Sequence, residues 1–250
     1  QIGPGRFYRD RIMEAFMPTG SKRQVEVAGA SPLADNFSLR DLSPVAEDGT
    51  PQPRTGPYPI INTNVILFND PDPKLRRRGG ENFVLSPDLV GSLSTGGASA
   101  NDAITKSITL ASAIATSGAA ANPNSGYIGT GVTRDRLLSI VMMLLNLRLG
   151  YWLANPGLPG VWTNRTPNHV LPSGLFALGL GFRSDSRFIE LSDGGHFDNL
   201  GVYELIRREL GLIVILDGEA DNTTGYAALV SVSQRVAEDF GHTILICDTL

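Results

Sequence analysis

Residues 192–216 read Ser-Asp-Gly-Gly-His-Phe-Asp-Asn-Leu-Gly-Val-Tyr-Glu-Leu-Ile-Arg-Arg-Glu-Leu-Gly-Leu-Ile-Val-Ile-Leu and combine a turn, a helix and a strand. Asp193 precedes two glycines, which let the backbone turn sharply and approach a neighbouring group without a Cβ in the way. The helix predicted over Leu200–Leu210 follows Asn199, a natural N-cap residue, and stops at a glycine. Leu212–Leu216 is then a continuous apolar strand, typical of a sheet covered on both faces.

The alternation of helix and strand continues toward the end of the chain. Ala227–Phe240 predicts an amphipathic helix, and Thr243–Cys247 predicts a second buried strand. Upstream, Ile60–Phe68 is rich in β-branched residues and also predicts a strand. We therefore expect an α/β domain with three layers, α/β/α. The three strands should share one sheet, with Leu200–Leu210 packed on its face.

Weaker patterns lie between these segments. They predict two short strands, two helices and one glycine-rich loop: Glu81–Ser86, Arg183–Ile189, Ile104–Ala121, Arg134–Leu153 and Gly91–Asn101. The second of these helices is apolar almost all round, which favours burial in the core, with a lipid-facing wall as the alternative. Residues 1–56 are loop-rich, with one helix predicted at Arg9–Phe16, and residues 57–250 form the principal domain.

Composition and charge limit the classes of protein to which this chain can belong. The 250 residues are 42% apolar, which is enough for one domain with a sizeable core. The formal net charge of −4 gives no electrostatic reason to bind nucleic acid. The single cysteine, Cys247, excludes an internal disulfide and suits a reducing compartment. We expect no signal peptide and no membrane-spanning segment in this chain, and a cytoplasmic or membrane-associated location.

The Asp193-Gly-Gly turn followed by Asn199-Leu-Gly resembles the second catalytic block of patatin-like lipid acyl hydrolases, relatives of the cytosolic phospholipases A. Pro59–Leu67 and Ala113–Gly126 look like the strand, and the small-residue helix with its proline turn, that precede this block in the family. Leu149–Trp152 resembles a segment found between the last two blocks of large bacterial members. The resemblance covers roughly residues 57–248.

The resemblance implies a carboxylic ester hydrolase of phospholipase or lysophospholipase type. In the family a serine and an aspartate form a dyad, so Asp193 would take the proton of the serine hydroxyl as it attacks an acyl ester. Gly194, Gly195, His196 and Asn199 would support the active-site loop. No metal or cofactor is implied. The expected partners are a lipid or phospholipid ester and a membrane surface.

The chain departs from the family at the nucleophile. No Gly-x-Ser-x-Gly elbow occurs in it, and the nearest imitations are Gly91–Gly96, with one residue too many, and Ala115–Ala119, which lacks the first glycine. The chain therefore resembles the C-terminal part of a catalytic domain that is inactive alone. The serine would come from an N-terminal half of the same protein or from a second chain.

Two other function classes stay open. One is a non-catalytic lipid-binding or scaffolding module that kept the fold and lost the serine. The other is an unrelated α/β small-molecule binder in which Asp-Gly-Gly is only a turn.

Three further patterns are weaker. Asp217, Glu219 and Asp221 alternate after a strand but do not match a calcium loop, which indicates a solvated strand end. Lys74–Arg78 is a basic run that would suit anionic headgroups but is more typical of a solvated loop. His169 and His242 have no partner at ligand spacing, and we assign them no role.

Overall fold

The computed structural model describes residues 3–17, 32–53, 56–122, 136–158, 181–219 and 225–245. Their centre is a six-stranded antiparallel sheet in the order β4-β3-β2-β1-β6-β5. The strands are β1 (Ile61–Ile66), β2 (Gly80–Leu85), β3 (Leu89–Ser92), β4 (Gly96–Ser99), β5 (Tyr151–Ala154) and β6 (Phe188–Asp193). The predicted mixture of helices and strands is confirmed at the level of α/β. The ladder is antiparallel, however, rather than the parallel ladder that alternating helices and strands favour.

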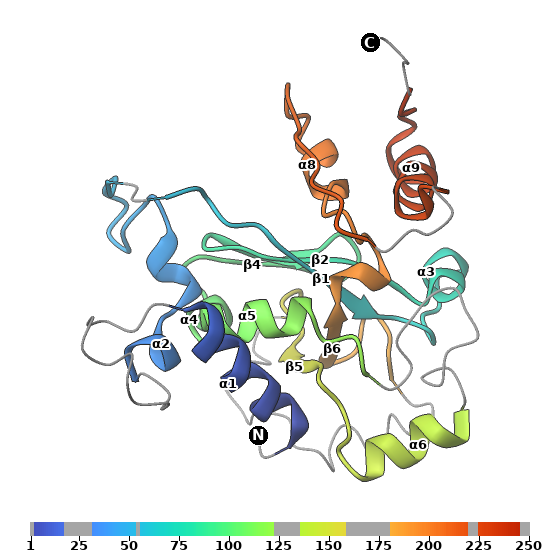
Figure 1. The fold of residues 1–250 in the computed structure, drawn as a ribbon, viewed down its shortest axis with the longest axis horizontal. Helices are drawn as coiled ribbons and strands as arrows, with labels where there is room; N and C mark the ends of the chain where they lie inside the picture. The colour runs from blue at the N-terminus through green and yellow to red at the C-terminus, as the bar shows by residue number, and fades with distance from the viewer. Residues whose placement is uncertain are drawn as a thin grey trace.

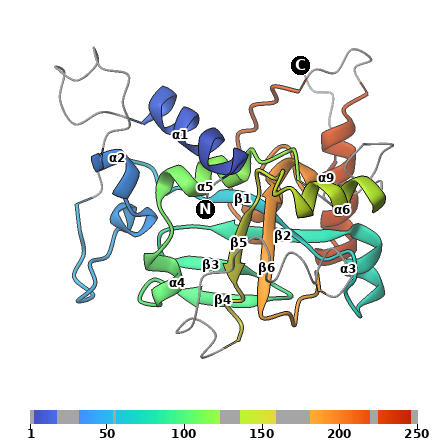
Figure 2. The same ribbon diagram turned by 90° about the horizontal axis from the view of Figure 1, so that it is seen from below.

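Helices flank the sheet on two sides. They are α1 (Pro4–Phe16), α2 (Pro32–Asn36), α3 (Pro73–Arg78), α4 (Ala103–Lys106), α5 (Leu110–Ser117), α6 (Arg136–Leu144), α8 (Tyr203–Arg207) and α9 (Ala227–Phe240), with 3-10 turns η1 (Leu39–Leu42) and η4 (Gly194–His196). Figure 1 shows α1 and α5 on one side of the sheet and α8 and α9 on the other. Figure 2, from below, shows α1 alongside α5 and the strands β1 to β4 spread next to one another.

The two central strands confirm their predictions. β1 pairs with β2 from Ile61↔Leu85 onward and with β6 at Thr63↔Asp193, so the predicted strands Ile60–Phe68 and Glu81–Ser86 lie side by side. The antiparallel pairing with β6 places the end of that strand beside the start of β1.

One face of the sheet carries the apolar core. Val65, Phe83 and Leu191 are fully buried there and pack in one cluster with Ala113 of α5. The small side chains of α5 let the helix lie close to the strands, as expected of Ile104–Ala121. That segment is two helices, because the side chain of Thr109 accepts a hydrogen bond from the backbone N–H of Ser112 and starts α5 anew.

The opposite face of the sheet is polar and nevertheless buried. Asn64, Asn82, Glu190 and Ser192 point to it from three neighbouring strands, and Asn64 Nδ2 donates to Ser192 Oγ over 3.2 Å. Such groups are costly to bury unless they are hydrogen-bonded. Asn64 and Ser192 bond to each other, whereas Asn82 Oδ1 and the Glu190 carboxylate oxygens have no hydrogen-bond partner among the described residues.

Glu190 makes stability depend on pH. Its side chain is 1% exposed, and burial raises the pKa of its carboxyl to about 7 from 4.5, against a smaller lowering by Arg148. The stabilising contribution of the protonated form is therefore fully present below about pH 4.5 and lost as pH rises through about 7.

We expect Glu190→Gln to remove this dependence. Between pH 5 and pH 8 the parent should lose on the order of 2–3 kcal/mol of unfolding free energy relative to the variant. Urea unfolding at both pH values measures this difference. Glu219→Gln, at an exposed position, is the control and should follow the parent. Equal pH profiles for parent and Glu190→Gln would contradict the prediction.

The expected strand Leu212–Leu216 is not in the sheet, and that prediction is wrong for the described chain. The segment is extended, and Leu212, Val214 and Leu216 are 82%, 75% and 91% exposed. Ile213 alone packs, against a cluster of α8 and α9 residues. Among the described residues, none forms a backbone hydrogen bond with this segment. Thr243–Leu245 is also outside the sheet, and the rest of Thr243–Cys247 lies beyond the described residues.

The long helix expected over Arg134–Leu153 is also only partly present. Its described part is α6, and Tyr151–Ala154 forms β5 instead, because apolar periodicity alone does not separate a buried helix from a strand. Core burial is not general either, since Leu137 and Leu144 are exposed. Within the described ranges, no helix has both the length and the apolar character needed to cross a bilayer.

Three other expectations need correction. Gly91–Asn101 is not a plain loop, since it contains most of the β3–β4 hairpin. Gly91 is required there, because a Cβ would overlap the backbone of Gly96 on the facing strand. The strand expected at Arg183–Ile189 is shifted to β6, and the helix expected at Leu200–Leu210 is confined to α8. The helix at Ala227–Phe240 is confirmed as α9.

The basic run at Lys74–Arg78 is internally paired. Arg78 is buried and donates to Asp239 over 2.8 Å and to Glu238 of α9, and Lys74 also contacts Asp239. The guanidinium and ammonium groups lower the pKa of the Asp239 carboxyl against the opposing effect of burial. These ion pairs join α3 to α9, so the run has a structural role.

Candidate active site

The candidate base, Asp193, is the last residue of β6. Its backbone N–H donates to the carbonyl of Ala119 over 3.3 Å, and its side-chain Oδ1 accepts from the N–H of Gly195 over 2.7 Å. Among the described residues, Oδ2 accepts no hydrogen bond, and the carboxylate has no ion-pair partner. One oxygen is therefore oriented by the backbone and the other is left for a ligand or a proton.

The two glycines are required by the close packing of this turn. A Cβ on Gly194 would overlap the carbonyl oxygen of Asn62 on β1. A Cβ on Gly195 would lie 2.5 Å from Oδ1 of Asn199 and 3.2 Å from Oδ1 of Asp193. The absent side chains let η4 rest on β1 and bring the Asn199 amide near the carboxylate.

His196 holds the turn on the sheet. Its Nδ1 lies 3.2 Å from Ser192 Oγ, which in turn accepts a hydrogen bond from Asn64. Burial lowers the pKa of His196, and the Asp193 charge acts in the opposite direction. Since Ser192 is fully buried, this serine–histidine contact is closed to a substrate. His196 therefore ties the turn to Ser192 of β6, and its supporting role at an active site stays a prediction.

Asp198 was missed by the sequence reasoning, which placed the helix cap at Asn199. The Asp198 carboxylate accepts hydrogen bonds from the N–H groups of Leu200, over 3.0 Å, and Tyr203, over 2.7 Å. Its backbone carbonyl accepts from Asn62 Nδ2 over 2.7 Å. The sequence signal for this role was the position of Asp198, an aspartate five residues before the start of α8. Asp198 and Asn62 together tie the loop after η4 to β1.

A cavity of about 490 Å³ opens in front of Asp193. Its walls are Ile60 with the start of β1 (Ile61 and Asn62), the end of α5 with Ile114, the turn Asp193–Gly195 and the loop Asp198–Gly201. The lining combines the isoleucines with the Asp193 carboxylate and the Asn62 and Asn199 amides. Such a combination suits a molecule with an apolar chain and one reactive polar group.

The two elbow-like stretches contain Ser92, Ser94 and Ser117, and of these three Ser117 lines this cavity. Its Oγ donates to the carbonyl of Asn62 over 2.7 Å and makes no hydrogen bond to Asp193. Ser92 lines a different cavity, beside β3.

The family's proline turn was expected near Asp193. Asn122 is buried and bonds to Gly150, and residues 123–126 lie outside the described residues.

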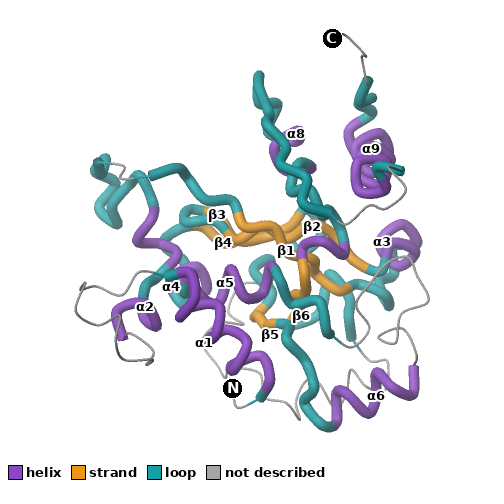
Figure 3. The backbone as a smooth tube through the Cα atoms, in the orientation of Figure 1, coloured by secondary structure: helices purple, strands orange, loops and turns teal. Residues whose placement is uncertain are grey.

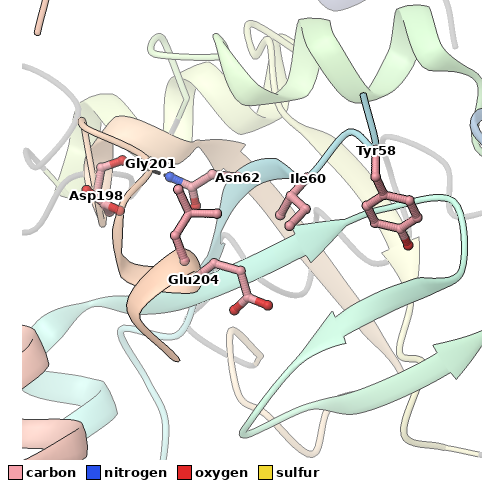
Figure 4. A pocket seen from close by; sticks show the side chains of 7 residues that line it. Tyr58, Ile60, Asn62, Asp198, Gly201 and Glu204 are labelled. Carbon is pink, nitrogen blue, oxygen red and sulfur yellow. Dashed lines mark hydrogen bonds between the residues drawn. The ribbon is translucent and has the colours of Figure 1, made fainter. Parts of the chain in front are cut away.

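A second cavity, of about 250 Å³, adjoins the first. It shares Asn62 and Asp198 with it and extends along α8 to Glu204 and Tyr58 (Figure 4). In Figure 4 the Glu204 carboxylate and the Tyr58 ring lie on the same side of β1 as Asn62. The two cavities therefore adjoin at Asn62 and Asp198, beside the start of β1.

Metal ligands do not gather in the described ranges, where no group of three or more His, Cys, Asp or Glu side chains could hold an ion. Asp217 and Glu219 are exposed, and the Asp217 carboxylate accepts from the N–H of Glu219. Asp221, His169 and Cys247 lie outside the described residues. The His242 ring lies 6.4 Å from the Phe240 ring, measured between centroids, at an interplanar angle of 47°.

Comparisons of the chain with protein-family models, with curated proteins and with solved structures gave no match.

Proposed function

We propose that this chain is the base-bearing part of a serine lipid acyl hydrolase, with Asp193 as the base of a Ser–Asp dyad. The observation that carries the proposal is the free Oδ2 of a backbone-oriented carboxylate in a half-apolar cavity. A carboxylate in this setting can accept the proton of a serine hydroxyl as it attacks an ester.

The nucleophile belongs to another segment in this proposal. Ser117 is engaged with the Asn62 carbonyl, and the described residues offer Asp193 no hydroxyl partner. The segment would come from elsewhere in the same protein or from a second chain. The exposed segment Leu212–Leu216 supports this proposal. Its five apolar residues have backbone N–H and C=O groups without partners among the described residues, and a further β-strand could pair with them. A three-layer α/β/α domain would form when that segment is in place.

The substrate is a lipid ester held at a membrane surface. The isoleucine wall of the cavity, Ile60, Ile61 and Ile114, supports an acyl chain beside the carboxylate. The exposed leucines of α6, Leu137 and Leu144, add apolar surface that a lipid interface would cover.

A fluorophosphonate probe, which needs an activated serine, tests the proposal. The full-length protein should be labelled on a serine outside residues 1–250, while these residues alone should remain unlabelled and hydrolyse no lipid ester. Tryptic mapping by mass spectrometry locates the label. A label on Ser92, Ser94 or Ser117 would show instead that the chain is self-sufficient. A folded full-length protein that takes no label would favour the alternative, a non-catalytic lipid-binding or scaffolding module.

A further inference from the structure

Tyr203 links the loop beside the candidate base to α9. It is the first residue of α8 and is 2% exposed. Its backbone N–H donates to Asp198 Oδ2 over 2.7 Å, and its phenol hydroxyl donates to Asp239 Oδ2, also over 2.7 Å. Asp198 lines the cavity in front of Asp193, and Asp239 lies near the end of α9. One buried residue therefore bonds to a wall of the cavity through its main chain and to α9 through its side chain.

The Asp239 end of this link is fixed by α3. Arg78 donates to both oxygens of the Asp239 carboxylate, over 2.8 and 2.9 Å, and Lys74 Nζ lies 2.5 Å from Oδ1. Burial and the hydrogen bond to Asp239 raise the pKa of the Tyr203 phenol, so its hydroxyl keeps the proton that it donates. Hydrogen bonds to an ionised acceptor are stronger than neutral ones. The phenol is thus attached to a carboxylate that a second helix holds in place (Figure 1).

Aromatic packing fixes the Tyr203 ring and extends the link to the glycine turn. Phe197 meets the ring edge to face, with centroids 5.0 Å apart, and Phe240 of α9 lies 4.9 Å from it. The Arg235 guanidinium of α9 lies 4.8 Å from the centroid of the Phe197 ring. Phe197 directly follows η4, and its N–H donates to the carbonyl of Gly194 over 3.0 Å. Side chains of α9 therefore contact both ends of the loop that follows the turn.

The carboxylate of Asp193 is held by other contacts. Its Oδ1 accepts from the N–H of Gly195, and its strand is paired with β1. The loop wall, in contrast, depends on Asp198, whose carboxylate accepts the N–H groups of Leu200 and Tyr203. A shift of Tyr203 would thus change the cavity wall and leave the base where it is.

We propose that Tyr203 is a positioning residue that sets the shape of the candidate cavity by holding the loop Asp198–Gly201 against α9. Its kinetic consequence rests on the proposed function. The loop is a wall of the cavity and carries no proton for the reaction, so it contributes equally to binding of the substrate and of the transition state. Loosening the loop should therefore raise KM and leave kcat nearly unchanged.

Amide hydrogen exchange in the full-length protein tests the link without reference to activity. Tyr203→Phe keeps the ring and removes the hydroxyl, so exchange over residues 197–203 should become at least about fivefold faster, while β1 and β2 keep the parental rates. The matched control is Tyr226→Phe, which removes an exposed hydroxyl at the other end of α9 and should change no rate in either region. Parental exchange over residues 197–203 in Tyr203→Phe would overturn the proposal, whether or not the protein hydrolyses esters.

Steady-state kinetics with an acyl ester separates positioning from general stability. Tyr203→Phe should raise KM at least about threefold and keep kcat within about twofold, whereas loss of folded enzyme would lower the apparent kcat at an unchanged KM. In an Asp239→Ala background the same substitution should add no further increase, because the hydroxyl has already lost its acceptor.

A parental KM in Tyr203→Phe, or an equal rise in KM with and without Asp239, would overturn the proposal. A full-length parent that takes no fluorophosphonate label and hydrolyses no ester would overturn the proposed function instead. In that case the exchange rates over residues 197–203 still decide whether Tyr203 positions the loop.

Discussion

Replacing Asp193 with Asn should lower lipid-ester hydrolysis by the full-length protein by at least about a hundredfold, which is the low end for loss of a general base. The asparagine oxygen can still accept the N–H of Gly195, so the turn keeps its shape and the melting temperature should barely move. Initial rates with a fluorogenic acyl ester and a thermal scan measure the two quantities.

The control for this prediction is Asp217→Asn, which changes an exposed aspartate that also accepts a backbone N–H two residues ahead. It should leave the rate unchanged. Parental activity in Asp193→Asn would mean that Asp193 is a turn residue only. A large fall in melting temperature would mean that the lost activity reflects lost structure.

The second large effect is expected on self-association, from substitutions in the exposed and unpaired segment Leu212–Leu216. Changing Leu212, Val214 and Leu216 together to Lys should keep residues 1–250 monomeric at concentrations about tenfold higher than the parent tolerates. An extended apolar segment with unpaired peptide groups is a template for intermolecular pairing, and lysines on it oppose such pairing. Light scattering across a dilution series gives the onset of association.

A matched triple variant separates strand pairing from apolar area. Leu137, Val141 and Leu144 of α6 are also exposed, but the helix satisfies its own backbone groups. Lysines at these positions should raise solubility much less. In the full-length protein, the variant at 212, 214 and 216 should also lose activity, because it charges the surface proposed to pair with the nucleophile-bearing segment. Equal solubility gains in both triples, with activity kept, would contradict this use of Leu212–Leu216.

The sequence predicted the elements whose pattern is decided locally. The β-branched run of β1 and the amphipathic α9 were correctly predicted because each has a clear period and clear ends. The β3–β4 hairpin was missed because its glycines, which lower strand propensity, are needed for the close approach of Gly91 and Gly96. Leu212–Leu216 has a strong strand pattern, yet a strand also needs neighbours, and the described residues provide none.

The candidate site was visible only in part for a similar reason. Asp-Gly-Gly marked Asp193, since the glycines leave a direct trace in the sequence. The place of Asn62 and Ser117 in the cavity could not be predicted, because it depends on β6 joining β1 and on α5 packing across both. Asn62 and Asn64, at alternate positions of β1, were the local sign of a polar sheet face.

The hydrogen bonds of the antiparallel ladder that carries Asp193 do not involve Leu212–Leu216. In Figure 3 the sheet is orange and the segment that follows α8 is drawn as loop. The position of the carboxylate is thus set before any further strand is added. Under the proposed function, the step that limits the onset of activity is then the arrival of that strand. If the strand is in the same polypeptide, onset is first order and independent of dilution. If it is in a separate chain, onset slows on dilution, and the concentration of that chain regulates the enzyme.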